Sequence, residues 1–170
     1  MSIEPFLILI ESFYFIDIRP QSGYVFQRVR DVSTTDWLLS VLLVPYGIVN
    51  KLSNILSMED EDTLSKYLRV DCKASSTQLV VKALINDTFS TLFITNTNIA
   101  LDQTTSLKIY QVYDQILGVH NFEILINGAL VYSTPNTKPI VLTNQAIYTS
   151  ALNITSAKAR IRNLYVLDLP

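Results

Sequence analysis

Residues 121–134 read NFEILINGALVYST, and this stretch decides the fold. Apolar and polar side chains alternate on both sides of Asn127-Gly128, a dipeptide that is the strongest short-range signal for a β-hairpin with a two-residue turn. Both central residues of that turn need a positive φ, which asparagine and glycine tolerate. Counting outward from the turn predicts four pairs: Ile126 with Ala129, Leu125 with Leu130, Ile124 with Val131, and Glu123 with Tyr132.

This pairing assigns the hairpin side chains to two faces, because neighbouring residues of a strand point to opposite sides of the sheet. The face predicted to line the core carries Phe122, Ile124, Ile126 and Val131. The other face carries Glu123, Leu125, Leu130 and Tyr132, and a curved sheet could present it to solvent or to a partner.

The rest of the chain has the same character, with strand signals about every ten to fifteen residues and almost no helical spacing. Residues 36–47, DWLLSVLLVPYG, are apolar on both faces, which predicts a central or doubly covered strand with Trp37 in the core. One helical candidate stands out, a single turn within MEDEDTLSKY at 58–67. Further strands are predicted in SNILSM, KYLRVDC, TQLVVKALI, STLFITNT, SLKIYQVYD, PIVLTNQAIYT and KARIRNLYVLDL. Nine or ten strands in one domain indicate an all-β fold of two packed antiparallel sheets.

Composition limits the classes of partner. The 170 residues suit one domain, and the net charge of -2 with scattered lysines and arginines argues against nucleic acid. Charged residues make up only 16% beside 49% hydrophobic residues, which indicates a partly apolar outer surface.

The N-terminal residues 1–22 form an apolar segment whose role is open between an extra strand and a leader peptide. Glu4, Glu11 and Asp17 interrupt it, no lysine or arginine precedes it, and no small-residue cleavage site follows, so the strand is favoured. The main domain is then expected at 23–170. No other apolar run approaches the roughly 20 residues of a membrane-spanning helix, so no transmembrane segment is predicted.

The order of elements resembles the concanavalin A-like superfamily, and within it the laminin G-like jelly-roll modules. The resemblance covers about residues 23–170 and is best from Leu107 onward. Its motifs are SLKIYQVYD, FEILINGALVYS, NTKPIVLTNQAIYTS and a closing strand ARIRNLYVL that has Ala159 where glycine is commoner. The resemblance implies a jelly-roll β-sandwich that acts as a non-catalytic, lectin-like binding or adhesion module for glycans or protein partners, outside the cell or on its surface.

Candidate ligand-binding residues are tyrosines and amides, because an aromatic ring can cover the apolar face of a sugar while amides bond its hydroxyls. The alternative for the tyrosines is packing between strands. The candidates are Tyr110, Tyr132, Asn96, Asn98, Asn136 and Asn144.

The acidic run at 59–62 is the only dense set of hard oxygen ligands, which suits calcium in charge and ligand type. The run consists of Glu59, Asp60, Glu61 and Asp62. Its alternative role is a solvated loop that keeps neighbouring strands from pairing with another chain. No other cofactor is predicted.

Two other classes of function stay open. A structural or assembly subunit would pack its apolar sheet face against copies of itself or another chain. A glycoside hydrolase-like enzyme would need two positioned carboxylates, and Glu59 with Glu61 has a suitable i, i+2 spacing. This run lacks strand periodicity, however, and His120 is the only histidine, so no catalytic activity is predicted.

Overall fold

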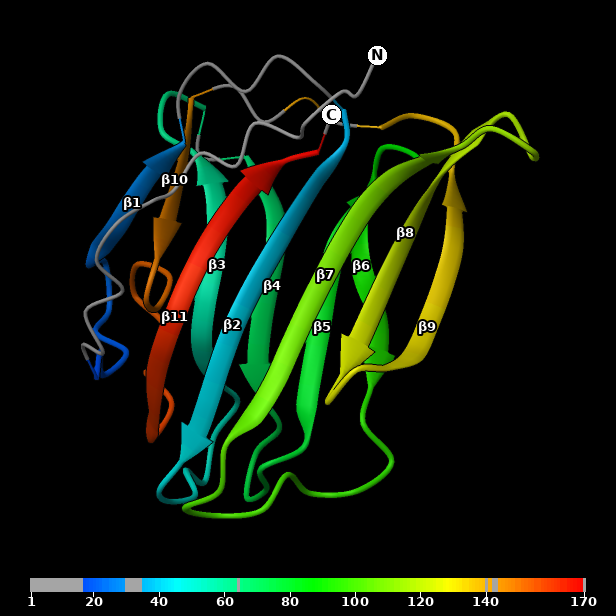
Figure 1. The fold of residues 1–170 in the computed structure, drawn as a ribbon. Coiled ribbons are helices and arrows are strands. Elements are labelled where there is room, and N and C mark those ends of the chain that lie inside the picture. Colours follow the sequence, from blue (N-terminus) through cyan, green and yellow to red (C-terminus); the bar gives the residue numbers. More distant parts are fainter. Residues whose placement is uncertain (1–16, 30–34, 64, 140, 142–143, 170) are drawn as a thin grey trace, which may run out of the picture.

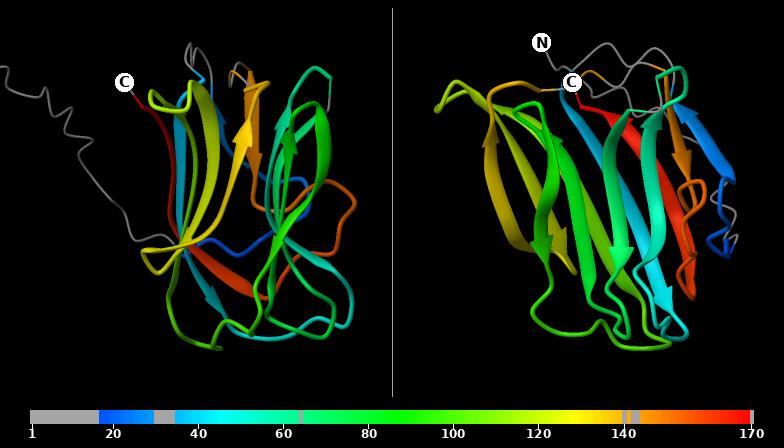
Figure 2. Two further views of the ribbon diagram at one scale, coloured as in Figure 1. Left: turned by 90° about the vertical axis from the view of Figure 1, so that its right-hand side faces the viewer. Right: turned by 180° about the vertical axis from the view of Figure 1, so that it is seen from behind.

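The chain folds into two antiparallel sheets that pack face to face (Figure 1). A computed structural model describes residues 17–29, 35–63, 65–139, 141 and 144–169. The six-stranded sheet contains, in spatial order, β1 (Val25–Val29), β10 (Gln145–Tyr148), β3 (Ser53–Asp60), β4 (Lys66–Cys72), β5 (Leu79–Ile85) and β6 (Thr88–Ile94). The five-stranded sheet contains β11 (Ala159–Asp168), β2 (Trp37–Pro45), β7 (Thr105–Asp114), β8 (Val119–Ile126) and β9 (Ala129–Asn136). Figure 2 shows the two layers edge-on, and the predicted all-β jelly-roll sandwich is confirmed.

The core lies between the two sheets and is built from the inward side chains of alternating strand positions. On β2 these are Trp37, Leu39, Val41 and Leu43, all buried in the core cluster. The Trp37 and Phe122 rings form a T-shaped pair between β2 and β8, with the ring centroids 6.2 Å apart. Hydrogen bonds to β11 on one side and β7 on the other make β2 an interior strand, as its two apolar faces predict.

The tight turn of the β8–β9 hairpin is confirmed at Asn127 and Gly128, whose φ angles are 50° and 80°. Asn127 also ties the turn to the neighbouring strand β7. Its backbone N–H donates to the carbonyl of Ser106 at 2.9 Å, and its side-chain Oδ1 accepts the N–H of Ser106 at 2.9 Å.

Beyond Leu125 the hairpin register differs from the prediction, because a β-bulge intervenes between Ile124 and Leu125. Ile124 pairs with Tyr132 and Glu123 with Ser133, so the predicted pairs Ile124–Val131 and Glu123–Tyr132 are wrong. A bulge sets two residues of one strand against one of the other and reverses the faces beyond it. Tyr132 therefore packs on the core, and Val131 is 37% exposed.

The helical turn predicted within residues 58–67 is wrong. Met58 to Asp60 complete strand β3, and residues 61–63 form a turn that leads toward β4. The Asp60 side chain holds this turn, since its Oδ1 accepts the N–H of Asp62 at 3.0 Å and that of Thr63 at 2.7 Å. Aspartate bonds the backbone two or three residues ahead in this way and thereby competes with a helix.

Residues 1–16 of the predicted N-terminal segment lie outside the described residues. The described part extends the five-stranded sheet at its edge, because Ile18 exchanges two backbone hydrogen bonds with Ile161 of β11. The boundary between residues 22 and 23 stays a prediction. No helix in the described part of the chain combines the length and apolarity that a membrane crossing requires.

Gly128→Val is expected to lower the free energy of unfolding by about 1 kcal/mol or more, because a β-branched residue is strained at positive φ. A Cβ at this position would meet no atom within 4 Å, so crowding does not contribute to the loss. Thermal and urea unfolding measure it. Gly128→Asn is the control and should cost much less, since asparagine tolerates this conformation. Equal melting temperatures for the valine and wild-type chains would contradict the turn.

Candidate functional site

A groove of about 530 Å³ opens where the edges of the two sheets meet. It is lined by residues of the long β6–β7 loop and of the β8–β9 turn. Figure 1 shows this loop and this turn at the lower end of the sandwich. Its apolar part comes from Phe93, Ile99, Ile126 and Val131. Its polar part consists of amide and hydroxyl side chains: Thr95, Asn96, Thr97, Asn98, Gln103, Thr104, Thr105 and Asn127.

The loop that forms one wall of the groove is fixed by side-chain hydrogen bonds. Oδ1 of Asn98 accepts the hydroxyl of Ser76 at 2.6 Å and the backbone N–H of Thr77 at 3.1 Å. The Thr77 hydroxyl donates to the carbonyl of Ile99 at 2.6 Å. A ligand therefore meets a wall whose shape exists before binding.

None of the residues that line this groove carries a charge. Asn96, Thr97, Gln103 and Thr104 are exposed there, and Phe93 and Ile126 are partly buried beside them. Such a surface offers neutral donors and acceptors next to apolar contact. This combination suits an uncharged ligand that has both hydroxyl groups and C–H faces.

Of the six predicted ligand-binding residues, the structure brings only Asn96 and Asn98 to one site, this groove. Asn136 is fully buried and ties the end of β9 to β7 and to the β5–β6 turn, because its Nδ2 donates to Gln111 Oε1 and its Oδ1 accepts the N–H of Asn86. Asn144 lies at the acidic turn, where its side-chain amide donates to Asp62.

The two predicted tyrosines lie on opposite faces of the five-stranded sheet. Tyr132 faces the core, and its ring centroid is 6.2 Å from that of Phe93 on β6. Tyr110 is partly exposed on the outer face of β7, between Leu38 of β2 and Glu123 of β8. Neither tyrosine belongs to the residues that line the groove.

Three of the four carboxylates of the acidic run have different partners. Asp60 caps its own turn, both oxygens of Glu61 accept from Arg28 Nε at 2.7 and 2.9 Å, and Asp62 accepts from Asn144. The hydrogen bonds from Thr63 hold the pKa of Asp60 below its usual range. No three His, Cys, Asp or Glu residues within the described ranges are grouped to hold a metal ion. Calcium binding by the run stays a prediction.

A second pocket, of about 560 Å³, lies on the outer face of the six-stranded sheet over β1, β10, β3 and β4. Glu59, Glu61, Arg28 and Tyr148 line it together. The pKa of Tyr148 is raised above its usual value by burial and by the negative charges of Glu59 and Glu61. The two glutamates therefore lie close enough to the Tyr148 hydroxyl for their charges to affect it.

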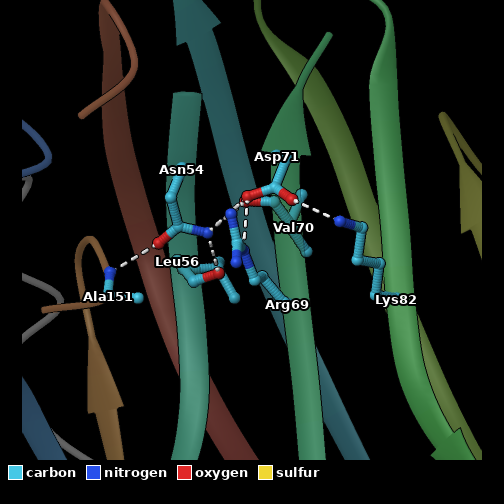
Figure 3. A network of polar contacts seen from close by, with 7 residues as sticks. All are labelled: Asn54, Leu56, Arg69, Val70, Asp71, Lys82 and Ala151. Carbon is cyan, nitrogen blue, oxygen red and sulfur yellow. Dashed lines mark hydrogen bonds and ion pairs between the residues drawn. The ribbon is translucent and has the colours of Figure 1, made fainter. Parts of the chain in front are cut away.

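Next to this pocket a network of buried polar groups crosses the same outer face (Figure 3). Asp71 of β4 is fully buried, and its Oδ1 accepts from Arg69 Nε at 2.8 Å and from Asn54 Nδ2 at 2.8 Å. The ammonium group of Lys82 on β5 lies 3.7 Å from Asp71 Oδ2. One carboxylate thus links three adjacent strands.

Asn54 connects this network to the loop after β10. Its Nδ2 donates to the carbonyls of Leu56 and Val70 at 3.0 Å each, where a β-bulge interrupts the β3–β4 ladder. Its Oδ1 accepts the backbone N–H of Ala151 at 2.6 Å, as Figure 3 shows. The network therefore ties β3, β4, β5 and the loop after β10 together on the face that carries the second pocket.

Sequence reasoning missed most residues at both pockets. For the buried network beside the second pocket, the alternation in KYLRVDC places Arg69 and Asp71 on the face opposite Leu68, Val70 and Cys72. The alternation shows that these two side chains share a face of the strand, but it does not show that they are buried. Gln103 and Thr104 lie outside the predicted strands, and no sequence pattern marks them as ligand-binding residues.

Comparison with known proteins finds similarity at the level of the fold. No protein-family model and no curated protein sequence matches the chain. A heptameric SAP-like pentraxin from Limulus polyphemus superposes with a TM-score of 0.61 at 11% identity, over 91% of this chain and 76% of that one. A Caenorhabditis elegans galectin superposes with a TM-score of 0.53 at 10% identity, over 89% of this chain and 95% of that one.

The carbohydrate-binding module CBM66 from Bacillus subtilis is also similar, with a TM-score of 0.52 at 15% identity over 78% of this chain and 75% of that one. Identities this low establish the architecture and no more. These solved structures are jelly-roll sandwiches, the same architecture as the two antiparallel sheets of the described residues. The chain therefore has the concanavalin A-like jelly-roll fold.

Proposed function

We propose that this chain is a non-catalytic carbohydrate-binding module whose groove, at Asn96 and Gln103, holds a neutral sugar. The observation that carries the proposal is the groove's lining, in which uncharged amides and hydroxyls lie beside apolar side chains. One of the solved structures with this fold is itself named a carbohydrate-binding module, which supports the class of ligand. An extracellular setting, which the resemblance implies, stays a prediction.

A pyranose presents two kinds of surface, and the groove offers a partner for each. Its C–H faces lose contact with water against apolar groups such as Ile126 and Val131. Its hydroxyls both donate and accept, so they pair with amide side chains such as Asn96 and Gln103 without a buried charge. The anchored loop at Asn98 limits the ordering cost of binding.

A glycan array followed by calorimetry on the best ligand tests the proposal. The double variant Asn96→Ala with Gln103→Ala is expected to weaken binding by roughly tenfold or more, since each lost hydrogen bond contributes about 0.5 to 1.5 kcal/mol. Gln115→Ala is the matched control, because Gln115 is an exposed amide in the turn at the opposite end of β7. Absence of any glycan ligand, or equal affinity of the double variant, would overturn the proposal.

An assembly role is the second candidate. The outer face of the β8–β9 hairpin presents Leu125 opposite Leu130, and Leu130 is 57% exposed. Lys108 and Glu123 share this face, which reduces its apolar character. Self-association on a sizing column that Leu130→Asp abolishes, together with no glycan signal, would favour assembly over binding.

An enzymatic role is third. The structure corrects one argument against it, because Glu59 belongs to strand β3 and lines the second pocket with Glu61. Glu61 is nevertheless held by Arg28 through both of its oxygens. Polysaccharide hydrolysis that disappears in both Glu59→Gln and Glu61→Gln would overturn the non-catalytic assignment.

A further inference from the structure

The pocket on the outer face of the six-stranded sheet is lined by a residue with a buried carboxylate oxygen that has no partner in the part of the chain that the structure describes. Glu59 is 7% exposed, and its Oε1 has no hydrogen-bond partner among the described residues. The hydroxyl of Ser57, two residues earlier on the same strand, is also buried and lacks a partner within the described part of the chain. Unpaired buried polar atoms are rare in folded proteins, because each costs free energy that a hydrogen bond would recover.

The geometry explains why the space beside Glu59 is open. Its cross-strand neighbour on β10 is Ala146, whose methyl group fills little volume. Lys66, its neighbour on β4, is exposed, and no ion pair within 4 Å joins it to Glu59 in the described residues. The nearest guanidinium that lines the pocket, that of Arg28, is bound to both oxygens of Glu61.

Arg28, Glu61 and Lys66 also line the pocket, and the uncharged part of its wall is apolar or aromatic. Val25 of β1 and Leu152 of the loop after β10 line the pocket together with Tyr148. Tyr148 lies across from Ser57 in the β10–β3 ladder, so its ring stands beside the two unpaired groups. The lining therefore places apolar side chains and the Glu59 carboxylate around one pocket.

We propose that this pocket binds a primary alkylammonium group, with the Glu59 carboxylate accepting an N–H from the ammonium and Val25, Leu152 and Tyr148 covering the alkyl chain. An ammonium group supplies the missing donor and also balances the buried negative charge, whereas a neutral hydroxyl supplies only the donor. A small free amine and a lysine side chain both carry this group. The site is separate from the sugar groove and does not depend on it.

The test follows backbone amides by heteronuclear NMR during titration with n-butylammonium chloride, butan-1-ol and N-acetyl-lysine methylamide. We expect butylammonium to shift the amides of Gly23, Glu59 and Tyr148, and butan-1-ol to bind at least about tenfold more weakly, since a charged hydrogen bond contributes roughly 1.5 to 3 kcal/mol. Stronger binding of the lysine derivative would identify a peptide ligand, and stronger binding of butylammonium a free amine. Either result supports the proposal.

Glu59→Gln is expected to abolish the preference for the amine over the alcohol and to leave the melting temperature unchanged or raised, because it removes an unpaired buried charge. The matched control Glu123→Gln, on the other sheet, should keep the preference. Equal binding of amine and alcohol, or an unchanged preference in Glu59→Gln, would overturn the proposal. A melting temperature several degrees lower in Glu59→Gln would also overturn it, since the carboxylate would then serve a structural bond.

Discussion

Ile124→Asp is expected to lower the free energy of unfolding by about 4 kcal/mol or more. Ile124 is fully buried between Ile109 of β7 and Tyr132 of β9. The substitution removes a buried aliphatic side chain, and it places a carboxylate where its neighbours on both adjacent strands are nonpolar. A small domain has only about 5 to 15 kcal/mol in total, so this loss is a large fraction of it.

Urea unfolding followed by circular dichroism measures the effect, and two control substitutions separate its causes. Ile124→Val removes one methylene group and should cost only about 1 kcal/mol. Leu130→Asp introduces the same charge on the same hairpin at an exposed position, and should change stability by about 0.5 kcal/mol or less. If Ile124→Asp were as stable as Leu130→Asp, the two faces of the hairpin would be reversed.

The core face of the hairpin could be predicted because two local signals agree there. The Asn-Gly turn sets the register of the residues beside it, and the period of two then places Phe122 and Ile124 on one face. The prediction failed at Val131, where a bulge inserts one residue. The bulge lets Tyr132 reach Phe93, which lies 39 residues earlier on the other sheet, and a local pattern does not report such a contact.

The interpretation of the acidic run as a solvated loop is wrong at Glu59 for a related reason. Its letters are hydrophilic, which indicates a solvated loop, yet Glu59 is the penultimate residue of β3 and is buried. Its surroundings are set by Ala146 and Lys66, which reach it only through the pairing of β3 with β10 and β4. The sequence therefore shows that the run is acidic, but it does not show which of its side chains are buried.

Two of the predicted ligand-binding residues, Asn96 and Asn98, line the groove. Asn96 and Asn98 stand out because they follow a strand, and polar residues at strand ends tend to lie at the surface. Gln103 and Thr104 join them only because the loop from 95 to 104 folds back beside the β8–β9 turn. That arrangement depends on the hydrogen bonds that Ser76 and Thr77, in the loop between β4 and β5, donate to Asn98 Oδ1.

Asp71→Ala has the second largest expected effect, a loss of about 3 kcal/mol or more in the free energy of unfolding. Asp71 is fully buried, and Arg69 beside it is nearly so. Removal of the carboxylate leaves the Arg69 guanidinium buried without its counter-charge, and breaking a buried pair in this way costs about 3 to 5 kcal/mol. The Asn54 amide loses an acceptor at the same time.

Lys82→Ala serves as the control for the weaker contact in the network. The Lys82 ammonium is 3.7 Å from Asp71, and its side chain is 23% exposed. Water therefore screens the pair, and we expect a loss of no more than about 1 kcal/mol. A loss equal to that of Asp71→Ala would show that Lys82, and not Arg69, balances the buried carboxylate.

The origin of the Asp71 effect can be isolated by a double-mutant cycle with Arg69→Ala, measured by urea unfolding. If the single loss comes mainly from the stranded guanidinium, the double variant should be more stable than the sum of the two single losses predicts, by roughly 1.5 to 3 kcal/mol. The 2.8 Å contact between Arg69 Nε and Asp71 Oδ1 is the basis of this expectation. Additive losses would mean that the two side chains are not coupled. Asp71 would then stabilise the sheet mainly through Asn54, and Asn54→Ala should reproduce most of its effect.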